Sequence, residues 1–330
     1  AKIALKNSQN RSEQSRNSTH HTDGTSQNPE IDLEKLKQAL AKSGLPSLLQ
    51  CQLDGTGVRY HRFLVQFSAY ADVAKKRPML CSEMGLAENH VRISLCVGQG
   101  LSNALYIDLL RPESQWQYFG QDAFHQAVEQ YKLSNRNDEL PIIMGLDEMG
   151  QVQYQDLATC NHILVAGKTG AGKSVFIRTL LGSLFALNDD KTVNVAILDP
   201  KQGVDYANYK ELPHLWDNRF ITNITDISDA LVEISEEMEH RDEERALYNA
   251  TKLADIPKTN RPPYLIVVID EVADLLDTDP EIETSIMRLT QRGRASGIFV
   301  ILATQSPDSK TLTTRLRANL ATRIALSVAT

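Results

Sequence analysis

The sequence has no apolar run near the ~20 residues that a membrane-spanning helix needs, and it has no closely spaced pair of cysteines. Apolar runs such as Leu265–Ile269 have the length of a strand. The four cysteines, Cys51, Cys81, Cys96 and Cys160, are scattered, which excludes a disulfide framework or a zinc site of the usual spacing. We therefore expect a cytoplasmic protein with reduced thiols and no membrane span.

An excess of positive charge is also absent: 35 Lys and Arg stand against 42 Asp and Glu, a net charge of −7. This excludes a uniformly basic nucleic-acid coat protein. The charge is unevenly distributed, since residues 226–283 contain 17 acids and 5 bases, and residues 285–330 contain 7 bases and 1 acid. Local balance matters more than the total because salt screens exposed charges beyond ~8–10 Å. We expect an acidic, solvated helix over 227–248 and a basic C-terminal segment that faces nucleotide, a neighbour or DNA.

Composition and hydrophobic pattern divide the chain into three segments. Residues 1–30 are half Ser, Asn, Thr and Gln, so we expect a disordered linker. Residues 31–157 combine a helical repeat with strand-like runs, which predicts a small α+β domain. In residues 158–330, Val- and Ile-rich strands alternate with helices, which predicts an α/β domain with a mainly parallel sheet flanked by helices. The chain starts without Met and stops just after the last strand, so we expect a piece of a longer protein, truncated in its last domain.

The strongest motif follows the strand predicted at 163–166. It reads GKTGAGKS and matches GxxxxGK[ST] in full, between a strand and a helix predicted over 175–185. Glycines let the backbone wrap around phosphates, and the loop amides and the helix N-terminus attract anions. Lys173 is expected to neutralise the β- and γ-phosphates, and Ser174 to ligate Mg²⁺. The predicted ATP-binding residues are Gly167, Lys168, Thr169, Gly170, Ala171, Gly172, Lys173, Ser174 and Val175.

A second motif is the hydrophobic strand 264–269, which ends in Asp270 and Glu271. Asp270 is placed to hold Mg²⁺, and Glu271 to polarise the attacking water as a general base. The alternative is that the two acids are only solvent-exposed residues at the end of a strand. The presence of the phosphate loop makes this alternative the weaker one. A Glu at this place favours hydrolysis over phosphate transfer to a small molecule.

Two weaker signals complete the candidate site. The strand predicted at 298–303 ends in Thr304-Gln305, and Gln305 is placed to sense the γ-phosphate. Arg292 and Arg294 lie at the end of a predicted helix. Either one could stabilise charge in a neighbouring subunit's site, or both could simply interact with the helix C-terminus.

Taken together, these segments resemble the FtsK/SpoIIIE family of DNA-pumping ATPases over residues 160–330. The match also includes Leu198-Asp-Pro-Lys201, the block Arg294-Ala-Ser-Gly-Ile298 and residues 317–324. The resemblance implies a RecA-like P-loop NTPase that forms a hexameric ring around double-stranded DNA and binds it without regard to sequence. It also implies that Arg294 acts in trans, and it makes Lys201 a functional residue of open role.

The resemblance leaves several functions open. The leading hypothesis is an ATP-driven translocase of double-stranded DNA that serves as the motor of a DNA restriction or defence system, with chromosome partitioning or plasmid transfer as alternative settings. Type VII protein-secretion ATPases are similar to the same family and form the main alternative. A nucleotide-binding scaffold with little turnover is disfavoured because Lys173, Ser174, Asp270 and Glu271 are all present.

Overall fold

The computed structural model describes residues 28–97, 100–201, 203–279, 281–305 and 312–327. Most of the predicted linker, residues 1–30, lies outside this range. The chain divides into two compact units: one holds the residues up to Phe124 together with Gly145–Gln153, and the other holds His125–Met144 and the chain from Tyr154 onward. Residues 125–144, which we predicted from the sequence to be part of the small domain, thus belong to the larger unit.

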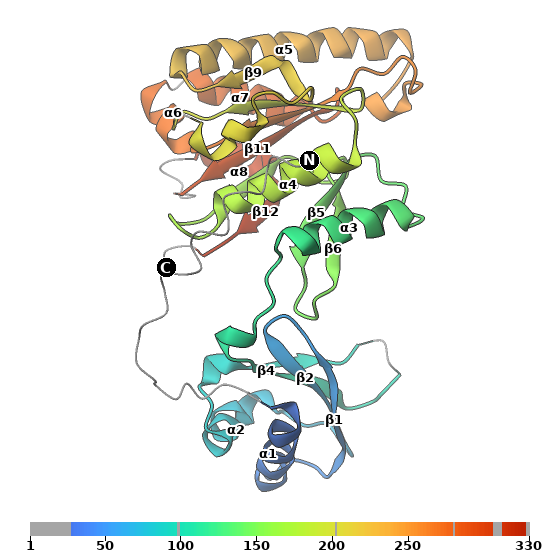
Figure 1. Cartoon of the computed structure of the whole chain (residues 1–330), viewed down its shortest axis with the longest axis vertical. Helices are drawn as coiled ribbons and strands as arrows, with labels where there is room; N and C mark the ends of the chain where they lie inside the picture. Colours follow the sequence, from blue (N-terminus) through green and yellow to red (C-terminus); the bar gives the residue numbers. More distant parts are fainter. Residues whose placement is uncertain (1–27, 98–99, 202, 280, 306–311, 328–330) are drawn as a thin grey trace. The chain divides into compact units, whose positions relative to one another are not determined.

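The smaller unit is an antiparallel sheet with two helices on one face (Figure 1). Its strand order is β1-β2-β4-β3. Inward side chains such as Phe63 and Ile107 pack against Leu36 and Leu40 of the first helix. Its main elements are α1 (Pro29–Lys42), β1 (Leu48–Thr56), β2 (Tyr60–Phe67), α2 (Arg77–Met84), β3 (Val91–Leu95) and β4 (Ala104–Leu110).

The larger unit is built on a six-stranded parallel sheet of order β12-β7-β11-β10-β8-β9. It confirms the predicted fold class. A two-stranded hairpin, β5 (Pro141–Leu146) and β6 (Val152–Asp156), follows α3 (Gln121–Leu133) near the division between the units. The elements of the main sheet are β7 (Ile163–Ala166), α4 (Lys173–Leu187), β8 (Val193–Leu198), β9 (Leu215–Ile221), α5 (Ile224–Leu247), β10 (Tyr264–Ile269), α6 (Val272–Thr278), α7 (Glu281–Arg292), β11 (Ile298–Thr304), α8 (Thr314–Asn319) and β12 (Thr322–Ala325).

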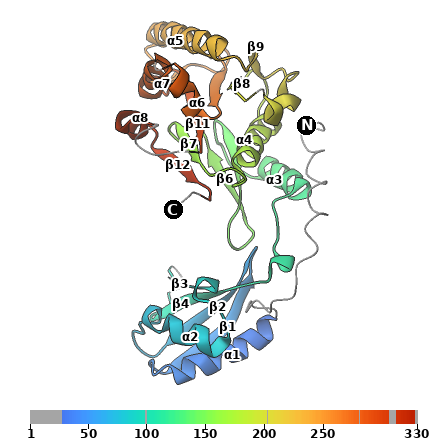
Figure 2. The same cartoon turned by 90° about the vertical axis from the view of Figure 1, so that its left-hand side faces the viewer.

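Helices cover both faces of this sheet, with α4 on one side and α5 to α8 on the other (Figures 1 and 2). The alternation within β10 explains the two cores. Ile266 and Val268 pack with the α4 side, whereas Leu265, Val267 and Ile269 pack with α5 and α7. A strand buried on both faces must be apolar at every position, which is why the run 264–269 could be read as a parallel strand.

The strand order places the candidate motifs side by side. β11 pairs with β7 on one side and with β10 on the other. The phosphate loop, Gln305 and Asp270-Glu271 follow the carboxyl ends of these three adjacent strands. In open α/β sheets this edge is where ligands bind. Among the described residues, no helix is both long and apolar enough to cross a bilayer.

His162 gives the larger unit a predicted sensitivity to acid. Its Nδ1 accepts a hydrogen bond from the Val300 N–H at 3.0 Å, so the buried ring is neutral. Burial, with a contribution from nearby Arg294, lowers the pKa of His162 to about 4. An unfolded histidine has a pKa of about 6.5, so acidification from pH 6.5 towards 4 favours the unfolded chain, by about 2 kcal/mol at pH 5.

We therefore expect His162→Gln, which removes the titrating ring but keeps a hydrogen-bond acceptor in the side chain, to lose less stability between pH 7.5 and pH 5 than the native chain does. Urea unfolding at the two pH values measures this difference. His240→Gln, at an exposed histidine, is the control and should keep the native pH dependence. An unchanged pH dependence in His162→Gln would contradict the assignment.

Candidate functional site

The phosphate loop leads into the start of α4, and the space beside two of its glycines is open. Gly170 and Gly172 have φ of +78° and +94°, and a Cβ added at either would meet no atom within 4 Å. The beginning of the loop is anchored where Gly167 N–H donates to Thr304 O at 3.2 Å and Lys168 N–H donates to Ser327 O at 2.9 Å. α4 then presents its first-turn amides and positive dipole end at this space, which suits a phosphate group.

Lys173, the first residue of α4, is buried against both acids of the second motif. Its Nζ lies 2.9 Å from Glu271 Oε2 and 3.3 Å from Asp270 Oδ1. The lysine side chain is only 10% exposed. A buried ammonium group is tolerated only when it is paired, so the two acids compensate its charge in this structure.

Glu271 occupies an unusual backbone conformation. Of the four non-glycine residues with positive φ in the described parts of the chain, the other three are Asn or Asp, for which this region is more accessible. Glu271 has φ 50° and ψ 55°, immediately before α6. Strain of this kind is found at functional sites, where the surroundings hold the residue in place.

Four hydrogen-bond donors contact the carboxylate of Glu271. Oε2 accepts from Lys173 Nζ, Lys201 Nζ and Gln305 Nε2 at 2.9, 2.9 and 2.8 Å, and Oε1 accepts from the Gln305 N–H at 3.0 Å. Burial by itself raises the pKa of Glu271, but the two lysines and the Gln305 amide lower it to about 2. The carboxylate is thus ionised, and three of its four hydrogen bonds fall on the single oxygen Oε2.

Gln305 connects the phosphate loop to Glu271. Its Oε1 accepts from Thr169 Oγ1 at 2.6 Å, while its Nε2 donates to Glu271. This bridge exists because β11 lies between β7 and β10 in the sheet. The structure therefore brings together Thr169, Lys173, Glu271 and Gln305.

Asp270 is held by a residue that the sequence does not reveal. The buried Tyr206 hydroxyl donates to Asp270 Oδ2 at 3.0 Å, and burial beside this carboxylate raises the pKa of the phenol. Tyr206 lies in a short 3-10 helix (Val204–Tyr209), and no motif marks it.

Asp199, directly after β8, is a further buried acid near this site: it is 2% exposed, and burial raises its pKa. Its place at the end of the strand next to β10 is the signal that could have identified it.

The donor set fits a magnesium ion bound together with a nucleotide. Ser174 follows Lys173 in the first turn of α4, and Asp270 lies next to the Lys173 ammonium group. Magnesium takes one or two protein oxygens and completes its shell with phosphates and water. Within the described ranges, no three His, Cys, Asp or Glu side chains form a metal site without such help.

Arg294 is not part of this cluster. It precedes β11, whereas Gln305 follows β11, and seven strand residues separate the two by about 20 Å. Arg294 is exposed and lines a surface depression of about 740 Å³ at the amino-end edge of the sheet. Arg292 is paired with Asp242 at 2.8 Å. Arg294 therefore does not reach the phosphate loop of its own chain.

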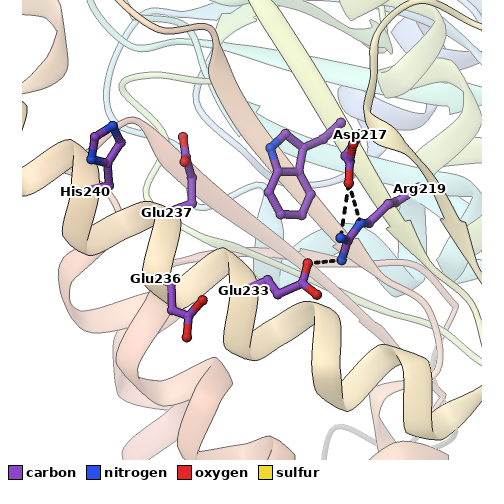
Figure 3. A pocket seen from close by; sticks show the side chains of 7 residues that line it. Asp217, Arg219, Glu233, Glu236, Glu237 and His240 are labelled. Carbon is purple, nitrogen blue, oxygen red and sulfur yellow. Dashed lines mark hydrogen bonds and ion pairs between the residues drawn. The ribbon is translucent and has the colours of Figure 1, made fainter.

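Another depression, of about 640 Å³, lies between β9 and α5 (Figure 3). Trp216 lies in it, with the Arg219 guanidinium 5.2 Å from its ring centre. Arg219 is also ion-paired with Asp217 and Glu233. Glu236 and Glu237 add further negative charge, which repels phosphates, so this depression is not a second nucleotide site.

The parallel sheet, the glycine loop at the head of α4 and the acids after β10 define a P-loop nucleotide-binding protein of the α/β class. The chain also matches a family model. The FtsK/SpoIIIE family model matches residues 124–261 and 250–309, which together are more than half of the chain, so the chain belongs to this family. This confirms the resemblance seen in the motifs.

Similar proteins include two curated DNA translocases. FtsK of Chlamydia pneumoniae is 35% identical over 221 residues, which cover 62% of this chain and 27% of that protein. SftA of Bacillus subtilis (strain 168) is 38% identical over 214 residues, which cover 62% of this chain and 22% of that protein. The chain spans about a quarter of the length of these relatives.

Two solved structures with the same fold are a conjugation coupling protein and a secretion ATPase. The monomer form of the pCW3 conjugation coupling protein TcpA with ATPγS aligns at a TM-score of 0.56 and 20% identity, over 89% of this chain and 83% of that one. The cytoplasmic domain of the type VII secretion ATPase EccC of Thermomonospora curvata aligns at a TM-score of 0.53 and 25% identity, over 60% of this chain and 25% of that one.

The Tyr206–Asp270 hydrogen bond generates a prediction about the metal. We expect Tyr206→Phe to raise the Mg²⁺ concentration needed for half-maximal binding of a fluorescent ATP analogue by about tenfold, because Asp270 loses the group that orients it. A Mg²⁺ titration measures this. Tyr209→Phe is the matched control, because its hydroxyl donates to the Arg178 carbonyl and not to an acid. Equal Mg²⁺ dependence in both variants would contradict the role of Tyr206.

Proposed function

We propose that this chain is the motor part of an ATP-hydrolysing translocase that moves double-stranded DNA. The observation that carries the proposal is the cluster at the carboxyl edge of the sheet, where the phosphate loop, Lys173, Gln305 and Glu271 meet. Family membership supports it, as do relatives named DNA translocases. The proposal places the protein in the cytoplasm and includes a DNA restriction or defence system as its setting, with segregation and transfer as alternatives.

In this proposal each of these residues has its own part in the chemistry. The glycine loop and the α4 N-terminus bind the phosphates of ATP, and Lys173 moves from Glu271 to the β- and γ-phosphates. Glu271, once released by Lys173, accepts a proton from the attacking water. Gln305, held between Thr169 and Glu271, senses the γ-phosphate. Ser174 and Asp270 would hold Mg²⁺, which would neutralise charge on the β- and γ-phosphate oxygens.

The proposal extends to a homo-oligomer, a hexameric ring in which Arg294 of one chain completes the site of the next. Its position supports action in trans, because Arg294 is exposed and lies about 20 Å from Gln305 along β11 of its own chain. DNA in the ring would be contacted through its phosphates, independently of sequence.

A protein-secretion ATPase is the second candidate, favoured by the likeness to EccC at 25% identity. The two candidates share the nucleotide chemistry and differ in the polymer that is moved. The effect of duplex DNA on ATP hydrolysis therefore separates them.

We expect the chain to hydrolyse ATP faster when duplex DNA is added. Glu271→Gln should lower kcat by at least about a hundredfold, the usual worth of a general base, while ATP is still bound. Lys173→Ala should lose ATP binding. Steady-state hydrolysis and binding of a fluorescent ATP analogue measure the two properties.

Glu236→Gln, the same substitution at an exposed acid of α5, is the control and should behave as the native chain. Normal hydrolysis by Glu271→Gln would refute the assignment of the base. Hydrolysis that duplex DNA does not accelerate, in chains that assemble into a ring, would instead favour the secretion reading.

The trans role of Arg294 predicts complementation. Arg294→Ala and Lys173→Ala should each be nearly inactive alone, but a mixture should partly recover hydrolysis because intact sites form where the two chains meet. Hydrolysis across mixing ratios measures this. Arg292→Ala, at the arginine paired with Asp242, should stay active alone. A mixture that never exceeds the average of its components would contradict action in trans.

A further inference from the structure

Glu271 is contacted by two lysines that lie in different segments of the chain. Lys173 is the first residue of α4, and Lys201 lies in the loop after β8. Both ammonium groups are 2.9 Å from the same oxygen, Oε2. They differ in exposure, because the Lys173 side chain is 10% exposed and the Lys201 side chain 48%. Only Lys173 belongs to the phosphate loop, so the two lysines have different roles when phosphates enter.

The arrangement around Oε2 is crowded. Two positive groups and the Gln305 amide converge on one oxygen, which normally accepts about two hydrogen bonds. Departure of Lys173 towards the phosphates relieves the repulsion between the ammonium groups. It would also leave a buried carboxylate that needs a cation, because an unpaired buried charge is costly. Gln305 cannot meet this need, since its amide is neutral.

We propose that Lys201 is a positioning residue for Glu271: it is the cation that stays on the carboxylate when Lys173 moves to the nucleotide. This inference rests on the proposed function, because it assumes that Glu271 is the base. Lys201 acts through Glu271 and does not bind the nucleotide. It keeps the carboxylate beside the phosphate loop while one acceptor site becomes free for water.

The surroundings of Lys201 suit this role. Its backbone N–H donates to Asp199 Oδ1 at 2.9 Å, and Asp199 is buried, so the base of the side chain is anchored. Its ammonium group has a second acid, Asp274 of α6, at 3.9 Å. Partial burial lowers the pKa of Lys201, but the hydrogen bond to Glu271 and nearby acids raise it overall, so the group is charged.

The test is the split between kcat and KM. We expect Lys201→Met to lower kcat for ATP by about tenfold while KM and the affinity for a fluorescent ATP analogue change by less than about twofold. Once Lys173 has moved, the variant has no cation left on the Glu271 carboxylate, which slows the chemical step but not the binding of ATP. Lys201→Arg, which restores a cation, should recover most of kcat. Lys191→Met, at an exposed lysine before β8, is the matched control.

A double-mutant cycle separates failure of this inference from failure of the proposed function. If Lys201 acts through Glu271, Lys201→Met should have no further effect on the residual rate of Glu271→Gln. An inactive Glu271→Gln together with a fully active Lys201→Met would overturn only the role of Lys201. The same holds if Lys201→Met raises KM at unchanged kcat, which would make Lys201 a phosphate ligand. An active Glu271→Gln would overturn the base itself.

Discussion

The site is organised by one buried ion pair, between Lys173 at the head of α4 and Glu271 after β10. Each charge would be costly to bury alone, and each is tolerated because the other lies 2.9 Å away. Lys173 lies after β7 and Glu271 after β10, and these strands are not neighbours because β11 lies between them, so a residue at the end of β11 can bond to both sides. Gln305 does so through its side chain and its backbone amide.

The same pair explains how a strained residue persists. A left-handed backbone costs a non-glycine residue roughly 1–2 kcal/mol. At Glu271 the cost is offset by its own N–H, which donates to Asp270 Oδ1 at 2.9 Å, and by the donors on its carboxylate. Since Lys173 is one of those donors, its proposed move to the phosphates would remove part of the support of the strained residue. Under that proposal, occupancy of the phosphate loop and the state of the base are physically coupled.

Sequence reasoning was most successful where the signal is local. The phosphate loop is contiguous, and the strands at 163–166, 264–269 and 298–303 are apolar on both faces, so all were found within a residue or two. β1 was missed because it is an edge strand with no fully buried residue and no continuous apolar run to mark it. Tyr206 and the partner of Lys201 were missed for another reason. Both contacts join residues about 65 to 70 positions apart, and only the strand order makes them neighbours.

The charge distribution has a different meaning in three dimensions than along the chain. The acidic helix α5 is not simply a solvated face, because Glu239 and Asp242 pair with Arg288 and Arg292 of α7. These pairs are about half exposed on the arginine side and add little stability, but they neutralise two of the bases of the C-terminal segment. Arg288 and Arg292 are thus poor candidates for contacts with a phosphate backbone. Arg294, two positions further along, is exposed and has no such acidic partner among the residues that the structure describes. Part of the uneven charge along the sequence is neutralised by these ion pairs between α5 and α7. The basic surface available to another molecule is therefore smaller than the number of arginines suggests.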